Sequence, residues 1–448
     1  MNRFIILSIL YIFLACATEY NRQRIIDSAE KYFQSGKFDR AYMEFESELD
    51  AHYTDTELHK EFIKFVSRIH RCEDAKKYYE GSVYREKDRR YLYHYAKGLL
   101  GILCFGAKKA DVIKNFEESI RLKPDDFEVR FRYGVILTEY EMFEEARKEF
   151  IKLLEIKNDS PSLYSYLALC ESHIGEFHLT RENIRKMLTL NFSEQDLIRA
   201  NNALGIANFK CMDVPEDIKE DFRRILDKIM VEDRPSEARE MTESLLLKYR
   251  DVTALHLAKG LSLAMTGEYS TALYELNSQE GSAGSCSYFQ YASGIIYLGV
   301  QKEEKGIVHL QKAIELDPLF ASAYKILAEV YYTKKEYEKA SNLLEIYLRL
   351  KDDDNITRFQ YGRILIGLSK IKDAEKEFEK ILRRDSENTL GMIGMGLVER
   401  EYAKLSKDKD KRERHMKRSL DYLNRAIKKD PENENIKSLI NSINSKED

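Results

Sequence analysis

Residues 287–320 read SYFQYASGIIYLGVQKEEKGIVHLQKAIELDPLF, and their pattern of small and large residues returns every 34 residues. The eighth position is small in five successive stretches, at Gly260, Gly294, Ala328, Gly362 and Gly396. A second small residue follows after twelve positions and a Leu or Phe after sixteen, as at Gly306 and Leu310. A period of this length fits two antiparallel helices with their turns. Each pair can bury its apolar face only against a neighbour, so the period predicts a solenoid.

The composition favours the same all-α architecture. The chain has 448 residues, of which 43% are hydrophobic and 33% charged, with only six prolines and no tryptophan. Few prolines and abundant Lys, Glu, Leu and Ile favour helix throughout. The net charge of −4, from 73 basic and 77 acidic residues, gives no global basic excess. We therefore expect no nucleic-acid partner.

The N-terminus predicts export. Arg3 supplies a positive charge and Phe4–Leu14 is almost entirely apolar. That run is too short to span a bilayer and suits a signal peptide over residues 1–15. Residues 12–16 (IFLAC) resemble a bacterial lipobox, which implies cleavage before Cys16, lipidation of Cys16, a tether at 16–21 and a periplasm-facing protein anchored to an envelope membrane. The alternative is an ordinary secretory signal cut near Ala17.

The five other cysteines predict no redox or zinc motif. They are far apart and form no C-x-x-C pair: Cys72, Cys104, Cys170, Cys211 and Cys286. Export would permit disulfides, but an odd number cannot all pair within one chain. Cys104 and Cys170 lie in apolar helical runs, and we interpret both as small core residues.

The repeat can be followed back, with decreasing fidelity, to about Tyr20. Ala29, Tyr32, Gly36, Ala41 and Phe45 have the spacings found from Gly294 to Leu310. A proline closes several units, as in Leu316-Asp317-Pro318. This pattern resembles the tetratricopeptide repeat (TPR). The resemblance implies a superhelical solenoid of about ten to eleven helix pairs, in which the first helix of each unit lines the concave surface.

The register divides the chain into two blocks of repeats. We expect a degenerate N-terminal block at 22–230, a connecting orphan helix at 231–252 and a strict C-terminal block at 253–431. A capping helix and tail follow at 432–448. Units are predicted to begin near residues 22, 56, 93, 127, 161, 198, 253, 287, 321, 355 and 389.

The last unit carries an insertion near residues 403–416. Gly396 and Leu423 are 27 residues apart instead of sixteen, so about eleven residues have been added. The insertion and its flanks are rich in basic residues, at Lys404, Lys407, Lys409, Lys411, Arg412, Arg414, Lys417 and Arg418. These could contact anionic lipid or an acidic partner. The plainer interpretation is an extended helix pair with a solvated charged tip.

Catalytic motifs are almost absent from the sequence. There is no G-x-x-x-x-G-K-[ST] loop, H-E-x-x-H pair or complete EF-hand pattern. The glycine- and serine-rich stretch 281–285 lacks the central serine of a nucleophile elbow, and 391–396 has no βαβ unit around it. We therefore expect no enzyme, cofactor or metal site.

The TPR resemblance also implies where a partner would bind. Positions 2, 5, 9 and 12 of each first helix face the groove, while neighbouring positions already fill the core. Apolar residues there should form an exposed stripe suited to a protein or peptide segment. The implied groove residues are Leu257, Leu261, Tyr288, Tyr291, Ile295, Lys325, Tyr332, Phe359, Arg363, Ile393 and Leu397. Alternatively, the terminal helix or a second copy of the chain fills the groove.

Together these features predict a non-enzymatic protein–protein interaction scaffold of the bacterial cell envelope. Its partners would be a protein segment, a membrane through the N-terminal lipid, and in the self-association case a second copy. One alternative function is a TPR assembly factor for outer-membrane or cell-wall machinery. An enzyme whose site is assembled from scattered residues is a more remote alternative.

Overall fold

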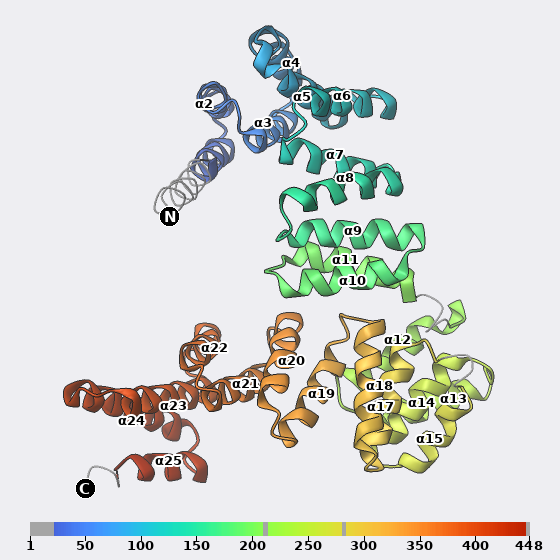
Figure 1. Cartoon of the computed structure of the whole chain (residues 1–448), viewed down its shortest axis with the longest axis vertical. Helices are drawn as coiled ribbons and strands as arrows, with labels where there is room; N and C mark the ends of the chain where they lie inside the picture. The colour runs from blue at the N-terminus through green and yellow to red at the C-terminus, as the bar shows by residue number, and fades with distance from the viewer. Residues whose placement is uncertain (1–21, 209–213, 280–283, 445–448) are drawn as a thin grey trace. The chain divides into compact units, whose positions relative to one another are not determined.

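The computed structural model describes residues 22–208, 214–279 and 284–444, and no strand occurs within these ranges. Helices follow one another as antiparallel pairs, which confirms the all-α repeat architecture (Figure 1). The chain divides into two compact units. Among the described residues, unit 1 comprises 22–176 and 192–203, and unit 2 comprises 177–191 and the remainder from 204 onward. The number of repeats and the block boundaries given above remain predictions.

In unit 1 residues 22–34 are helical. The helices that follow are α2 (Phe38–Ala51), α3 (Thr56–Arg68), α4 (Cys72–Tyr78), α5 (Arg90–Leu100), α6 (Lys109–Leu122), α7 (Phe127–Glu139), α8 (Phe143–Ile156), α9 (Pro161–Ile174) and most of α11 (Glu194–Asn208). Two π-helical turns, η1 (Tyr79–Val83) and η3 (Gly101–Phe105), and one 3₁₀ turn, η2 (Lys87–Arg89), interrupt this series.

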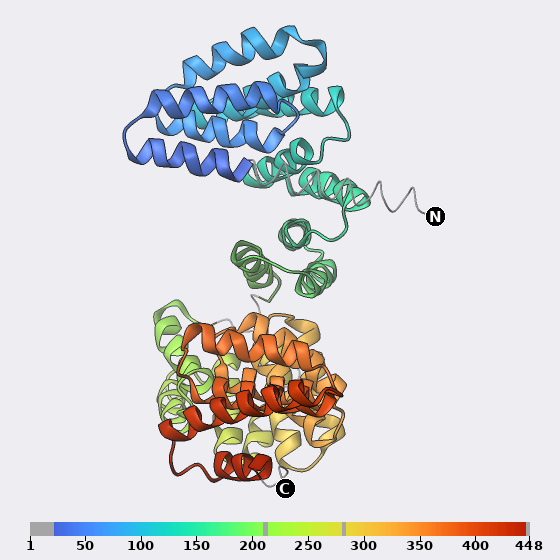
Figure 2. The same cartoon turned by 90° about the vertical axis from the view of Figure 1, so that its left-hand side faces the viewer.

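Unit 2 holds the strict repeats, which stack as successive layers of helix pairs (Figure 2). Its helices are α10 (Phe177–Thr189), the 3₁₀ turn η4 (Glu216–Ile218), α12 (Lys219–Met230), α13 (Pro235–Leu246), α14 (Thr253–Met265), α15 (Tyr269–Asn277), α17 (Ser287–Gly299), α18 (Glu303–Leu316), α19 (Ala321–Thr333), α20 (Tyr337–Leu350), α21 (Asn355–Gly367), α22 (Ile371–Arg384), α23 (Thr389–Leu405), α24 (Lys409–Lys429) and α25 (Glu434–Asn444).

The small residues of the repeat lie where a large side chain of the paired helix packs. A Cβ atom added to Gly294 would lie 2.7 Å from Leu310 Cγ, and one added to Gly362 would lie 2.4 Å from Phe378 Cζ. Phe378 is fully buried and also lies against Gly394 of the next unit. The sixteen-residue spacing therefore records a steric fit between paired helices.

This fit predicts opposite effects for two glycines of α21. Gly362→Ala is expected to lower the free energy of unfolding by about 1–3 kcal/mol, because the added methyl overlaps the Phe378 ring. Gly367→Ala meets nothing within 4 Å and should raise it by about 0.4–1 kcal/mol, because alanine restricts the unfolded chain. Urea unfolding of the two variants beside wild type measures both. Equal effects of the two substitutions would contradict the steric explanation.

The connecting helix expected within 231–252 is α13, and it is paired rather than isolated. It packs against both α12 and α14. Ala238 stands 34 residues before Ala272 and is fully buried, so α12 and α13 follow the repeat register. Leu226 occupies the position of the usual small residue and Thr242 that of the usual large one. The unit therefore lacks the small residue that marks the other units in the sequence.

A repeated hydrogen bond closes the turn into many first helices. The fourth residue of the helical repeat reaches the backbone carbonyl six residues earlier, as Tyr324 Oη does to Pro318 O at 3.0 Å. Four residue types make this bond. The donor side chains and acceptor carbonyls are His59 with Tyr53, Arg130 with Pro124, Tyr164 with Asn158, His256 with Arg250, Gln290 with Gly284, Tyr324 with Pro318 and Arg358 with Asp352.

One cysteine assignment made from the sequence is wrong. Cys104 is not a core thiol: it forms a disulfide with Cys72, their Cα atoms 5.9 Å apart. The π-helical turn η3 brings Cys104 beside the start of α4, where Cys72 lies. Cys170 is a fully buried free thiol, as expected. Cys286 is also disulfide-bonded.

Candidate functional site

The predicted groove residues are less exposed than the sequence suggested. Leu257, Leu261, Tyr291 and Ile393 are all buried, so the expectation of an exposed stripe is wrong for these four. The reason is that first helices of neighbouring units pack directly on one another: α14 contacts both α12 and α17. The Tyr291 ring packs 4.8 Å from that of Phe320 (centroid to centroid). Ile393 shares an apolar cluster with residues of the terminal helix α25.

The remaining groove residues form a smaller surface. Tyr288, Ile295, Lys325, Phe359 and Leu397 are half-buried, whereas Tyr332 and Arg363 are exposed. We call the surface on α19, α21 and α23 the A-helix face; it consists of Lys325, Tyr332, Ile356, Phe359, Arg363 and Leu397.

Two interactions stiffen this A-helix face. The Arg363 guanidinium lies 6.0 Å from the centre of the Phe359 ring, and Lys325 Nζ lies 3.2 Å from Asp354 Oδ2. Ile356 is 64% exposed beside them. The role of this face in partner binding remains a prediction.

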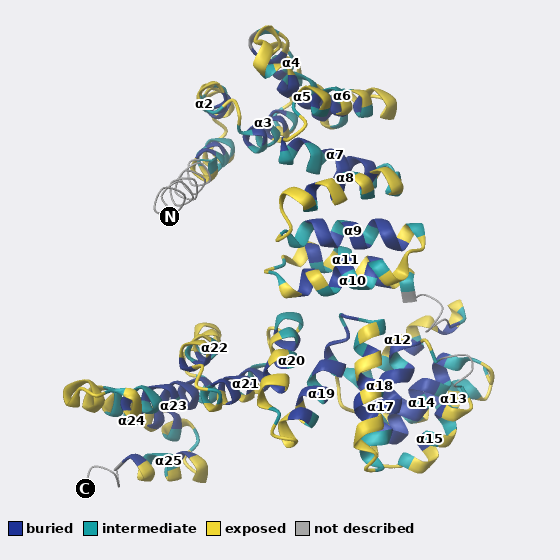
Figure 3. Ribbon diagram, viewed as in Figure 1, coloured by how far each residue is buried: buried dark blue, intermediate teal, exposed yellow. Residues whose placement is uncertain are grey.

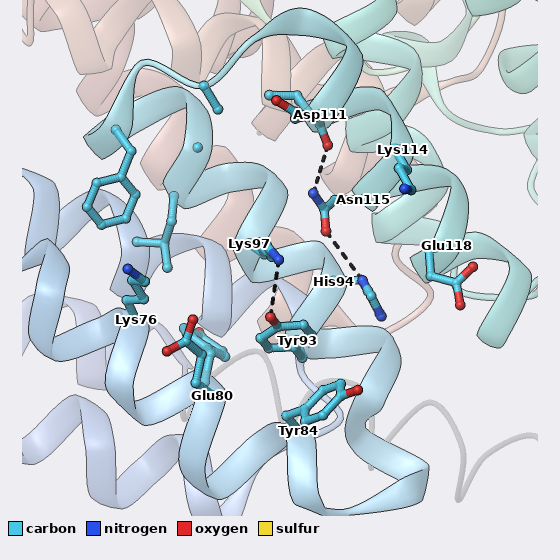
Figure 4. Close-up of a pocket in the computed structure, with 16 residues that line it drawn as sticks. Lys76, Glu80, Tyr84, Tyr93, His94, Lys97, Asp111, Lys114, Asn115 and Glu118 are labelled. Carbon is cyan, nitrogen blue, oxygen red and sulfur yellow. Dashed lines mark hydrogen bonds between the residues drawn. The ribbon is translucent and has the colours of Figure 1, made fainter.

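A cavity of about 800 Å³ lies in unit 1, away from the groove residues predicted from the sequence. We call it the outer pocket; α4 with η1, α5 with η3, and α6 form its walls (Figure 4). Its lining mixes aromatic, basic and acidic side chains with an apolar end. The lining residues are Lys76, Tyr79, Glu80, Tyr84, Tyr93, His94, Lys97, Leu100, Gly101, Phe105, Ala107, Asp111, Val112, Lys114, Asn115 and Glu118.

The polar groups at the centre of the outer pocket are held by one another (Figure 4). Asn115 Nδ2 donates to the Asp111 carbonyl at 2.7 Å, so Asn115 Oδ1 accepts from His94 Nδ1 at 3.3 Å. In the neutral imidazole this leaves Nε2 as an acceptor. The Lys97 ammonium donates to the Tyr93 hydroxyl at 3.3 Å. The pocket therefore offers both donors and acceptors beside aromatic rings.

Local irregularities of the backbone create the outer pocket. Gly98 packs against Phe116 as other units pack Gly against Leu or Phe, but the two lie two residues further apart in sequence. The π-helical turn η3 lies between them and takes up additional residues, and η1 forms the opposite wall. Such π turns are frequent at functional sites. The sequence showed the two extra residues but not the cavity that they open.

A polar cluster also bridges α3 and α7 in unit 1. Lys60 Nζ lies 3.6 Å from Glu128 Oε1 and contacts Glu57 more closely. Burial, together with the hydrogen bond and charge of Glu57, raises the pKa of Glu128 to about 8. The pKa of Glu57 is lowered despite its burial, because Glu128 and Lys60 hydrogen-bond to it. The two carboxyl groups therefore share one proton at neutral pH.

This shared proton predicts a pH-dependent stability. The folded chain keeps the Glu128 proton up to about pH 8, whereas the unfolded chain releases it near the ordinary value of 4.5. The stability from this group is therefore complete below pH 4.5 and lost as the pH rises through 8. Urea midpoints of wild type should fall over this range, and those of Glu128→Gln should fall less. Parallel profiles for both proteins would contradict the shared proton; Glu144→Gln, at an exposed position, is the matched control.

The predicted membrane anchor cannot be compared with the structure. The predicted signal peptide, tether and lipidated Cys16 lie outside the described residues. Within the described ranges, no helix is both long and apolar enough to cross a membrane. The same ranges hold no cluster of three His, Cys, Asp or Glu residues suited to a metal ion.

Comparison with known proteins gives partial matches. No family model matches the chain. It is 26% identical over 142 residues to tetratricopeptide repeat protein 37 of Xenopus laevis, a stretch covering 31% of this chain and 9% of that protein. It is 26% identical over 106 residues to anaphase-promoting complex subunit 3 of Schizosaccharomyces pombe, a stretch covering 23% of this chain and 16% of that protein. The chain thus spans less than a fifth of the length of these relatives.

Solved structures give matches of low identity. YrrB, described as a TPR protein with an unusual peptide-binding site, aligns with 44% of this chain and 96% of its own at 16% identity and a TM-score of 0.37. The Cut9–Hcn1 assembly aligns with 89% of this chain and 77% of its own at 14% identity and a TM-score of 0.34. The 34-residue register, the helix pairs that follow it and the similarity to TPR-containing relatives identify this chain as a tetratricopeptide-repeat protein.

Proposed function

We propose that this TPR protein is a non-enzymatic scaffold of a bacterial cell envelope, and that it binds a segment of a partner protein in the outer pocket. The observation that carries the proposal is the pocket itself: its volume of about 800 Å³ lies within the range typical of binding sites. Its exposed rings, Tyr84 and Phe105, suit an apolar anchor from the partner. Lys97 and His94 Nε2 then supply polar contacts that fix the orientation of that segment.

The A-helix face is a second candidate surface for the same function. Tyr332 and Arg363 are of residue types that dominate interface hot spots, and both are exposed there. Two of its side chains are already engaged within the face, since Lys325 is bound to Asp354 and Arg363 lies over Phe359. We therefore rank it behind the pocket.

Site-specific crosslinking in cells tests which surface binds. A photoreactive phenylalanine analogue replaces Tyr84 in the outer pocket, Tyr332 in the A-helix face or Tyr274 as a control, which is 78% exposed and belongs to neither surface. We expect one discrete protein adduct at Tyr84 and none at Tyr274. An adduct at Tyr332 alone would move the site to the A-helix face. No adduct at either surface, or the same adducts at all three positions, would refute specific binding.

Two observations support the envelope location. The Cys72–Cys104 disulfide fits an oxidising compartment, and residues 12–16 resemble a lipobox. Metabolic labelling with a fatty acid should tag wild type and not Cys16→Ala, and wild type alone should fractionate firmly with membranes. Label on both proteins, or on neither, would refute lipidation at Cys16.

A further inference from the structure

The hairpin of α23 and α24 extends beyond the neighbouring helix pairs. α23 has 17 residues where α19 and α21 have 13, and α24 has 21 where α20 and α22 have 14. Leu423 still packs against Gly396, so the register of the pair is kept at its base. The added residues therefore lie at the shared end of the two helices. At 1.5 Å per residue they carry this end about 6–10 Å outward.

We call residues 404–418 the basic tip. Its eight Lys and Arg side chains outnumber the acidic ones, Asp408, Asp410 and Glu413, and all eight are exposed (Figure 3). Lys407, Lys411 and Arg412 make no ion pair with any described residue, whereas Lys404 and Lys409 pair within their own helices. The basic tip thus has a net positive charge that its own fold does not neutralise.

The apolar side chain at the end of the hairpin is Leu405, which is 69% exposed. It is the last residue of α23, and a short connection capped by Asp408 leads from it into α24. Since the described residues of unit 2 leave Leu405 largely uncovered, the end of the hairpin presents one aliphatic group surrounded by cations. This is the combination with which peripheral proteins contact a bilayer.

The arrangement of the cations favours a lipid surface over an acidic protein. Lys409, Lys411, Arg412 and Arg414 lie within six residues of α24, and at about 100° per residue they point to all sides of the helix. A protein groove would contact one side of the helix. A layer of headgroups surrounds whatever enters it, so cations on every side can each contact a phosphate.

We propose that the basic tip docks on an anionic lipid bilayer, with Leu405 entering the acyl boundary and the surrounding cations binding headgroup phosphates. Each basic residue near such a surface strengthens binding about fivefold. This contact is separate from the predicted N-terminal anchor and gives the protein a second membrane attachment at the opposite end of its repeat array in sequence. It is also independent of the partner-binding function proposed above.

The absence of tryptophan from the chain allows a direct test. In the full-length protein, Leu405→Trp makes a single reporter at the basic tip, and Val308→Trp makes one at a site that is 61% exposed elsewhere in unit 2. Vesicles of phosphatidylcholine are compared with an equal mixture of phosphatidylcholine and phosphatidylglycerol. We expect a blue shift of the Leu405→Trp emission with the anionic vesicles only, and none for Val308→Trp. High salt should reverse the shift.

Charge reversal then separates the outcomes. The Leu405→Trp protein is also given three reversals, Lys407→Glu, Lys411→Glu and Arg412→Glu. They should weaken vesicle binding by at least about 100-fold, because the loss of three cations alone accounts for that factor. The matched control reverses three exposed lysines elsewhere in unit 2, Lys312, Lys351 and Lys372, and should leave the response unchanged. An unshifted emission with anionic vesicles overturns the proposal. So does a shift produced by soluble polyglutamate but not by vesicles, which would assign the basic tip to an acidic protein.

Discussion

Arg358→Ala is expected to lower the free energy of unfolding by about 3–5 kcal/mol, the largest effect of any single substitution considered. The Arg358 side chain is only 1% exposed. It donates to the Asp352 carbonyl at 2.7 Å and to Asp352 Oδ1 at 2.5 Å, and it also pairs with Glu377. Truncation removes the buried guanidinium from the largely buried Glu377 carboxylate, which keeps only Lys380, and leaves the Asp352 carbonyl with Arg384 as its remaining donor. Chemical unfolding monitored by circular dichroism measures the loss.

Two matched variants separate the buried contacts from the loss of an arginine as such. Arg363→Ala, on the same helix but exposed, should change the stability by no more than about 0.5 kcal/mol. Arg358→Gln introduces the residue type that makes the same hydrogen bond at Gln290 in an earlier unit. This variant should keep the turn hydrogen bond and lower the free energy of unfolding less than Arg358→Ala does. If Arg358→Ala and Arg363→Ala destabilise the chain equally, the buried contacts are not the cause.

Replacing Cys72 and Cys104 together with alanine is expected to destabilise unit 1 by about 2–4 kcal/mol, because the disulfide closes a loop of 32 residues in the unfolded chain. Hydrogen exchange should show lost protection in α5, η3 and α6, the elements around the outer pocket, while α21 and α22 keep theirs. Exchange localises the effect, which matters because Cys286 is disulfide-bonded too.

Reductant supplies the control for this prediction. Added to wild type, it should produce the same local loss of protection around α5 and α6; added to the double variant, it should produce none there. Cys170→Ala removes a buried thiol that is not in a disulfide, so this variant should remain as sensitive to reductant as wild type. Unchanged protection around the outer pocket in the double variant would contradict a stabilising disulfide.

The repeat was readable from sequence wherever its period records a steric fit. Gly362 and Phe378 stand sixteen residues apart because one fills the space that the other leaves, and such a pairing allows few substitutions. The α12–α13 pair escaped the pattern because it has Leu226 where other units have a small residue and Thr242 where they have Leu or Phe. The period is therefore a reliable guide to units that use glycine and a weak guide to units that solve the packing in another way.

The functional surfaces were less readable than the fold. Position within a helix predicts the direction of Leu257 or Tyr291 but not whether a neighbouring helix covers that side, and here it does. The outer pocket depends on a π-helical turn, which two surplus residues can indicate but not locate. The turn-closing position escaped notice because its members, among them His256, Gln290 and Arg358, share a hydrogen bond and no residue type.

That turn-closing bond has a consequence for how such an array can change in length. Every unit that makes it carries its own donor, and the acceptor is a main-chain carbonyl that any residue supplies. Duplicating or deleting a whole 34-residue segment therefore leaves each remaining turn with both the donor and the acceptor of its hydrogen bond. Because His, Gln, Tyr and Arg can all donate this hydrogen bond, duplicated copies can diverge in sequence without losing it. A gene for such a chain can gain or lose units while the remaining units keep their hydrogen-bonded turns.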